Sequence, residues 1–215
     1  MRAIIFDFDN TLGNRYASVY RAFREYLRLN SELDPRSLLF ETVVQDFCVW
    51  DEAGAGNKKD MLAKIRDKFG IELDYRDFRK WWENHQNSYA ACFPKARELL
   101  EKLKGKYLLG CITNGEANAQ TMKLRNAGIY DMFDRIIISG SEKFAKPEKK
   151  IFTEMALRLG VQPSECIFIG DSFSLDIQGA LNAGYDAIWI CRNPYQPCDY
   201  NVKRIADISQ LEEIL

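Results

Sequence analysis

Five short runs of apolar residues, rich in β-branched side chains, alternate along most of the chain with segments of helical periodicity. The runs have the length and composition of parallel strands buried on both faces, and they cover residues 3–8, 107–113, 135–139, 166–170 and 187–191. Apolar positions three and four apart indicate amphipathic helices at residues 95–104, 116–127, 148–160 and 174–183. This alternation predicts an α/β fold, with a parallel sheet covered by helices on both faces.

The segment from residue 14 to residue 92 has a different pattern, without a convincing strand. Helical periodicity covers residues 15–29, 36–49, 58–69 and 75–88, and turn-forming residues separate these stretches. A helical block that follows the first strand of an α/β sheet is typical of a second domain that grows out of a loop. We therefore expect a core formed by residues 1–13 and 93–215, and an inserted helical domain formed by residues 14–92.

The composition limits which partners the protein is expected to bind and which kinds of site it can form. The 215 residues carry a formal net charge of −1 with 28% charged residues, an ordinary surface that does not favour nucleic acid polymers. No apolar run approaches the roughly 20 residues that a membrane helix needs, so we expect no membrane partner. The six cysteines form no Cys-x-x-Cys pair and are expected to be reduced thiols in a cytoplasmic protein. The single histidine, His85, excludes a zinc site built from several histidines.

Two acids stand at the end of the first predicted strand. Asp7 and Asp9 are spaced i, i+2, so their side chains are expected to leave the strand on the same face. Two carboxylates held this close repel each other and require a cation, a shared proton or a catalytic task. The reactive crevice of an open α/β sheet also lies outside the carboxyl ends of its strands. The pair therefore marks this edge of the sheet as the candidate site.

Two further acids and a lysine follow other predicted strands. Asp171 and Asp176 come after the fourth strand, and with Asp7 they offer the carboxylate oxygens that Mg²⁺ prefers. Lys146, in the loop after the third strand, supplies a compact positive charge. Because the carboxyl ends of parallel strands meet at one edge of a sheet, these side chains are expected to converge.

The end of the second predicted strand carries a candidate anion site. The hydroxyl of Thr113 lies beside the backbone amides of Asn114 and Gly115, at the start of a predicted helix. Mg²⁺ and Lys146 together would offset the aspartates and a phosphate dianion. A carboxylate nucleophile is established chemistry for phosphoryl transfer at such a site.

Four sequence motifs now stand in a recognisable order. They are Asp7-Phe-Asp9-Asn-Thr11, Thr113, Lys146-Pro147 and Gly170-Asp171-Ser172-Phe-Ser-Leu-Asp176. The set resembles the four motifs of the haloacid dehalogenase-like (HAD) hydrolase superfamily, and the helical insert resembles the α-helical C1 cap of one of its subfamilies. The resemblance implies a Rossmann-like parallel sheet in the order 5-4-1-2-3 with an inserted α-helical cap domain. It also implies Mg²⁺-dependent chemistry through a phosphoaspartyl enzyme.

The resemblance assigns a role to each motif residue. Asp7 resembles the nucleophile, and Asp9 resembles the general acid/base whose backbone carbonyl also contacts the metal. Thr113 and Lys146 resemble the phosphate-binding pair, and Asn114 is a further candidate because its backbone amide lies at the predicted helix start. The implied metal ligands are Asp7, Asp9 and Asp171, with Asp176 as a supporting carboxylate.

One residue favours phosphate esters over other substrates of the superfamily. The haloacid dehalogenases lack the second aspartate of the first motif, because an expelled halide needs no proton, whereas this chain has Asp9. The sequence therefore predicts a Mg²⁺-dependent phosphomonoester hydrolase that acts on a small phosphorylated metabolite, a nucleoside monophosphate or a sugar phosphate. Monomer and weak dimer are both compatible with the sequence.

Two other functions remain open at this point. A phosphomutase of the same subfamily is the first, although Gly13-Asn14-Arg15 stands where many cap-bearing relatives, including sugar phosphomutases, carry an acid. A non-catalytic regulatory module with the same fold is the second, and the intact acids and lysine argue against it. The tryptophans of the helical domain fit either a substrate pocket or, as aromatics at helical spacing more often do, a simple core.

Overall fold

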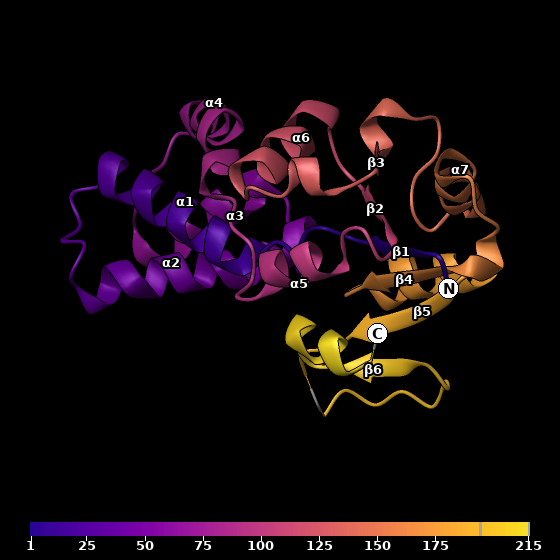
Figure 1. Ribbon diagram of the computed structural model, residues 1–215. Coiled ribbons are helices and arrows are strands. Elements are labelled where there is room, and N and C mark those ends of the chain that lie inside the picture. Colours follow the sequence, from indigo (N-terminus) through magenta and orange to yellow (C-terminus); the bar gives the residue numbers. More distant parts are fainter. Residues whose placement is uncertain (194, 215) are drawn as a thin grey trace. The chain divides into compact units, whose positions relative to one another are not determined.

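The core of the protein is a six-stranded, fully parallel sheet in the order β3-β2-β1-β4-β5-β6 (Figure 1). The computed structural model describes residues 1–193 and 195–214. The strands are β1 (Ala3–Phe6), β2 (Leu108–Thr113), β3 (Arg135–Ile138), β4 (Cys166–Gly170), β5 (Asp186–Ile190) and β6 (Lys203–Ile205). The first strand lies in the middle, paired with β2 on one side and with β4 on the other.

The strand order 5-4-1-2-3 is confirmed, and three of the strands differ from their predicted bounds by one residue. Two larger differences concern β6 and β1. A sixth strand, β6, extends the sheet beyond β5, and its sequence Lys-Arg-Ile has neither the length nor the alternation that identifies a strand. The first strand ends at Phe6, two residues earlier than predicted. A turn follows, in which the carbonyl of Phe8 accepts hydrogen bonds from the amides of Thr11, Leu12 and Gly13.

Helices cover both faces of the sheet. Alternate residues of β1 point to opposite faces, so that Ile4 and Phe6 enter one apolar cluster while Ala3 and Ile5 enter another. The first cluster includes the buried leucines of α5, and the second includes Phe152 of α7. The core helices are α5 (Ala96–Leu103), α6 (Ala117–Asn126), α7 (Lys149–Leu159) and α8 (Gln178–Ala183). A π-helical turn at Phe173–Ile177 leads directly into α8.

By its internal contacts the chain divides into two compact units, Met1–Asn14 with Cys92–Leu215, and Arg15–Ala91. The second unit is helical and contains α1 (Arg15–Asn30), α2 (Leu38–Trp50), α3 (Lys58–Phe69) and α4 (Tyr75–His85). Side-chain caps begin three of them, since Ser37, Asn57 and Asp74 each accept hydrogen bonds from backbone amides of the following turn. Across the described residues, the structure has no helix that is both long and apolar enough to cross a membrane.

The helical unit has its own aromatic core. The rings of Phe23 and Phe47 stack with their centroids 3.7 Å apart, and Phe78 meets the ring of Phe47 edge-on at 5.9 Å. Trp81 and Trp82 of α4 are partly buried against this cluster. At least some of the aromatic side chains of the helical unit therefore pack in its core.

Truncation of this core should destabilise the protein strongly. Phe47→Ala is expected to lower the free energy of unfolding by about 3–5 kcal/mol, because it removes a buried ring and leaves a cavity. Chemical denaturation followed by circular dichroism measures this. Val49→Ala on the same helix is the control, because Val49 is 70% exposed and should change the free energy by less than about 0.5 kcal/mol. Equal effects of the two substitutions would contradict the assigned packing.

Candidate active site

The central strand and its neighbour place two acids side by side. Asp7 follows β1 directly, and its amide donates to the carbonyl of Ile169 in β4 at 2.9 Å. Asp171 follows the last residue of β4, Gly170. Because β1 and β4 are parallel and in register, both acids leave the sheet at the same edge.

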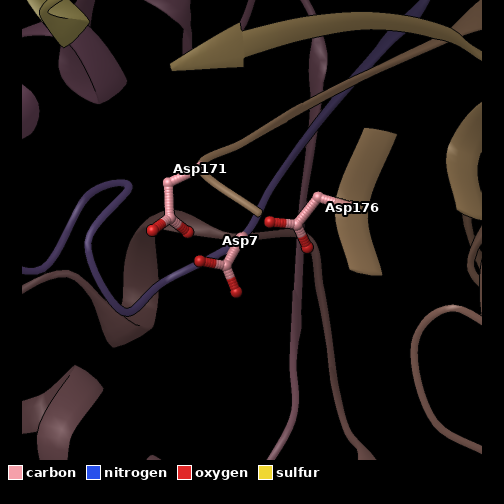
Figure 2. Close-up of side chains that lie close together, drawn as sticks. All are labelled: Asp7, Asp171 and Asp176. Atoms are coloured by element: carbon pink, nitrogen blue, oxygen red, sulfur yellow. The ribbon is translucent and has the colours of Figure 1, made fainter. Parts of the chain in front are cut away.

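The third acid comes from the π-helical turn after β4. The amide of Ser172 donates to Asp176 Oδ2 at 2.9 Å, which holds the buried carboxylate against the strand end. A side chain on Gly170 would collide with the Asp176 carboxylate, so this position must be glycine. The carboxylates of Asp7, Asp171 and Asp176 point toward one another, and one oxygen from each lies within 4.8 Å of the others (Figure 2).

Lys146 is the cation inside this acidic cluster. Its Nζ donates to Asp7 Oδ1 at 2.6 Å and to Asp176 Oδ1 at 2.7 Å, and its side chain is only 3% exposed. The backbone of Lys146 is held by Asn114 through two hydrogen bonds, Lys146 N–H to Asn114 Oδ1 at 3.0 Å and Asn114 Nδ2 to the Lys146 carbonyl at 2.9 Å. Asn114, at the end of β2, therefore holds the backbone of the lysine whose ammonium binds Asp7 after β1 and Asp176 after β4.

The residues expected to bind phosphate lie at the same edge. Thr113 is the last residue of β2 and is buried, and Asn114 follows it. Because the side-chain amide of Asn114 is engaged by the Lys146 backbone, the group of Asn114 left for an anion is its backbone amide. These placements agree with an anion site beside Lys146, and the phosphate contacts themselves stay a prediction.

Burial and mutual repulsion shift the pKa values of the acids upward. Burial raises the pKa of Asp7 to about 8; the charge of Lys146 opposes this shift, and Asp176 and Asp171 add to it. Burial also raises the pKa of Asp171 to about 6, with a further contribution from Asp176 and opposition from Lys146 and Arg192. Burial by itself lowers the pKa of Lys146, but the charges of Asp176 and Asp7 outweigh it, so that this pKa lies above its ordinary value.

The charge of the cluster fits a divalent cation. When all three carboxylates are ionised, the cluster with Lys146 has a net charge of −2 in a largely buried space. The donor set consists of carboxylate oxygens, which hard cations such as Mg²⁺ prefer over other side-chain donors. A cation of charge +2 would balance the cluster and lower the raised pKa values.

Asp9 lies in a separate environment. Its Oδ2 accepts hydrogen bonds from Lys123 Nζ at 2.8 Å and from Gln120 Nε2 at 3.0 Å. The strand alternation that placed Asp7 and Asp9 on one face does not apply, because β1 ends at Phe6. The grouped carboxylates are those of Asp7, Asp171 and Asp176, and the Asp9 carboxylate binds helix α6 instead.

Sequence reasoning missed Lys123 and Gln120. Both appeared as ordinary residues of an amphipathic helix. The signal that could have found them is their spacing, since Gln120, Lys123 and Leu124 are spaced i, i+3, i+4 and share the face that α6 buries. Arg192, just after β5, was also passed over. Its guanidinium lies 3.9 Å from the centre of the Phe93 ring, and its positive charge opposes the rise in the pKa of Asp171.

Fold and site together define a Rossmann-like α/β enzyme with an acidic centre at the carboxyl edge of its sheet. The sequence profile of haloacid dehalogenase-like hydrolases matches residues 1–184, so the chain belongs to this family. The family predicted from the four motifs is therefore confirmed.

Characterised relatives add the class of reaction. The chain is 30% identical to glyceraldehyde 3-phosphate phosphatase of Methanothermobacter thermautotrophicus, over the full length of both proteins. It is 27% identical to human N-acylneuraminate-9-phosphatase over 92% of this chain and 85% of that one. The HAD-hydrolase YfnB of Bacillus subtilis, solved with magnesium, superposes with a TM-score of 0.73 over 100% of this chain and 98% of that one; at 23% identity this shows the fold. The predicted enzyme class, a phosphoric monoester hydrolase, is confirmed.

The raised pKa values predict how stability depends on pH when no metal is bound. The folded protein holds protons on Asp7 and Asp171 up to pH values of about 8 and about 6, whereas the unfolded chain releases them near 3.8. Their contribution is therefore complete below about pH 4 and is lost as the pH rises through about 6 and about 8.

Denaturant unfolding in EDTA should show this loss between about pH 5 and 8.5, and Asp171→Asn should reduce the slope. Saturating Mg²⁺ should flatten the profile, because the cation stabilises the ionised acids. A metal-free protein whose stability rises with pH over this window would contradict the assignment.

Proposed function

We propose that the protein hydrolyses a small phosphomonoester with the help of Mg²⁺, through an aspartyl-phosphate intermediate on Asp7. The observation that carries this proposal is the buried cluster in which Lys146 joins Asp7 and Asp176 beside Asp171. The cluster combines a carboxylate nucleophile, a fixed positive charge and an oxygen donor set at one strand edge. These are the parts that phosphoryl transfer needs for positioning and charge stabilisation.

Lys146 and the end of β2 bind the phosphoryl group in this proposal. Two carboxylates hold the ammonium of Lys146, and two hydrogen bonds with the Asn114 side chain hold its backbone, so that the lysine loses little entropy when an anion arrives. The Thr113 hydroxyl and the Asn114 backbone amide supply neutral donors for the remaining phosphate oxygens. Asp176 serves mainly to orient Lys146, because one of its oxygens is bound to that ammonium and the other to the Ser172 amide.

The first half-reaction transfers the phosphoryl group to the protein. A carboxylate oxygen of Asp7 attacks phosphorus, and the bond between phosphorus and the leaving oxygen breaks. Asp9 gives its proton to that oxygen, which leaves as an alcohol. Asp7 then carries the phosphoryl group and Asp9 is a carboxylate.

The second half-reaction restores the enzyme. Asp9 accepts a proton from a water molecule as that water attacks phosphorus. The bond between phosphorus and Asp7 breaks, and inorganic phosphate is released. Asp7 is again a carboxylate and Asp9 again holds a proton, so that protons and electrons balance over the cycle.

The residues that would hold Mg²⁺ are Asp7 and Asp171 through their carboxylates and Asp9 through its backbone carbonyl. The bound cation would supply Lewis-acid stabilisation of the negative charge on the phosphoryl oxygens. The roles of nucleophile, proton donor and phosphate anchor fall to the chain's own residues.

The substrate class follows from the leaving group and from the relatives. Asp9 is needed where the leaving oxygen is a poor leaving group, as in an alkyl phosphate. Two of the phosphatases that are similar to this chain are named for phosphates of a sugar and of a sugar acid. A sugar phosphate is therefore the first substrate class to test, with a nucleoside monophosphate second. We assign the helical unit Arg15–Ala91 the role of a cap that excludes water and selects the leaving group.

A phosphomutase is the remaining alternative. The fold is shared with a β-phosphoglucomutase-like protein of Thermotoga maritima, with a TM-score of 0.72 at 20% identity, which shows the fold alone. A mutase returns the phosphoryl group to a sugar and accumulates no inorganic phosphate. The phosphate-release measurement that tests the hydrolase therefore separates the two.

Removal of the nucleophile should abolish turnover. Asp7→Asn is expected to lower kcat for p-nitrophenyl phosphate with Mg²⁺ by at least about 10³-fold, because no phosphoenzyme can form. Phosphate release and circular dichroism together report activity and folding. Asp186→Asn, an exposed acid at the start of β5, is the control and should retain wild-type kcat. An active Asp7→Asn protein would reject the assignment, and a wild type that releases no phosphate from any ester of a broad panel would reject the function.

Removal of the proton donor should discriminate between leaving groups. Asp9→Asn is expected to lower kcat for alkyl phosphates by about 10²-fold or more and to lower kcat for p-nitrophenyl phosphate far less, because p-nitrophenolate leaves without a proton. Steady-state kinetics with both esters measure the two losses. Equal losses would mean that Asp9 does not act as the acid.

A further inference from the structure

Two side chains of α6 hold one oxygen of the Asp9 carboxylate. Lys123 Nζ lies 2.8 Å from Asp9 Oδ2, and Gln120 Nε2 lies 3.0 Å from the same atom. Two donors on one oxygen fix the rotation of the carboxylate about its Cβ–Cγ bond.

Lys123 is placed inside the protein. Its side chain is only 8% exposed, whereas Met122 and Arg125 on the same helix are exposed to solvent. A buried ammonium is stable only with a charged or polar partner, and here that partner is Asp9. A lysine that merely improved solubility would project into water.

Gln120 is constrained as tightly. Its Nε2 also donates to the carbonyl of Asn114 at 3.0 Å, so two acceptors orient the amide. Gly115 has a φ of +144°, and a Cβ there would lie 2.7 Å from Gln120 Nε2. The Oε1 atom is buried without a hydrogen-bond partner among the described residues, a cost that the two bonds from Nε2 must offset. Glycine at position 115, in the loop after β2, therefore leaves room for the Gln120 side chain that binds Asp9.

We infer that Lys123, assisted by Gln120, is the positioning residue for the acid/base Asp9, an inference that rests on the proposed function. Because Oδ2 accepts from two N–H donors, we place the transferable proton on Oδ1. When the Oδ1–H bond breaks and the O–H bond of the leaving alcohol forms, the charge left on Asp9 faces the Lys123 ammonium. In the second half-reaction the proton from water returns to Oδ1. Lys123 thus acts on the reaction through Asp9, without contacting the phosphoryl group.

The leaving-group dependence of kcat tests this role. Lys123→Met should lower kcat for the fastest alkyl phosphate of the panel by about 10- to 100-fold and change kcat for p-nitrophenyl phosphate by less than about threefold, with KM nearly constant. Lys123→Gln, which keeps a donor, should recover part of the loss. Arg125→Met removes the same charge from the exposed side of α6 and should leave both rates unchanged. Equal losses for both esters would overturn the inference.

A double-variant cycle tests whether Lys123 acts through Asp9. In the Asp9→Asn background, Lys123→Met should cause no further loss of kcat for the alkyl phosphate, because the group that it positions is already absent. A further loss as large as that in the wild-type background would overturn the inference.

Thermal unfolding of the same four proteins tests the contact without any substrate. Each single substitution strips a partner from the pair, so the Tm of the double variant should lie above the value expected from adding the two single shifts. Additive shifts would overturn the inference even in an active enzyme. If the wild type hydrolyses no ester, the proposed function fails, and the unfolding cycle alone decides whether Lys123 holds Asp9.

Discussion

One buried ammonium group organises the candidate active site. Lys146 Nζ lies 2.6 Å from Asp7 and 2.7 Å from Asp176, so it joins the end of β1 to the turn that follows β4. Its reciprocal hydrogen bonds with Asn114 join the same residue to the end of β2. The lysine is tolerated in the interior because carboxylates surround it, and the carboxylates are tolerated together because of the lysine. Lys146 therefore contacts residues that follow three different strands, two of them through its charge and one through its backbone.

The two acids of the first motif are balanced by two different lysines. Asp7 is paired with Lys146 from the loop after β3, whereas Asp9 is paired with Lys123 from α6. A chain with one shared cation would tie the ionisation of the two acids to each other. Separate partners let one acid remain a nucleophile while the other exchanges a proton, which is the division of labour that the proposed reaction requires.

The parts of the site that follow from strand topology could be predicted from the sequence. Asp7, Lys146 and Asp171 stand at successive strand ends, and parallel strand ends meet at one edge whatever their side-chain rotamers. The i, i+3, i+4 spacing that includes Lys123 indicates the buried face of α6, but the pairing of Lys123 with Asp9 could not be predicted, because it depends on where β1 stops and on how α6 is rotated about its axis. Strand β6 was missed for another reason: a three-residue edge strand with two charged residues has no sequence signal.

Charge balance links the proposed metal centre to the proposed phosphate cradle. With its three carboxylates ionised, the cluster around Lys146 has a net charge of −2, and a divalent cation would bring it to zero. A bound phosphate dianion returns the site to −2, so that hydrogen-bond donors must disperse the new charge. The end of β2 offers such donors in the Thr113 hydroxyl and the Asn114 amide, while the Asn114 side chain fixes Lys146. In the proposed reaction, one short segment would thus position the ammonium of Lys146 that attracts the phosphate and supply the N–H and O–H donors that bind it.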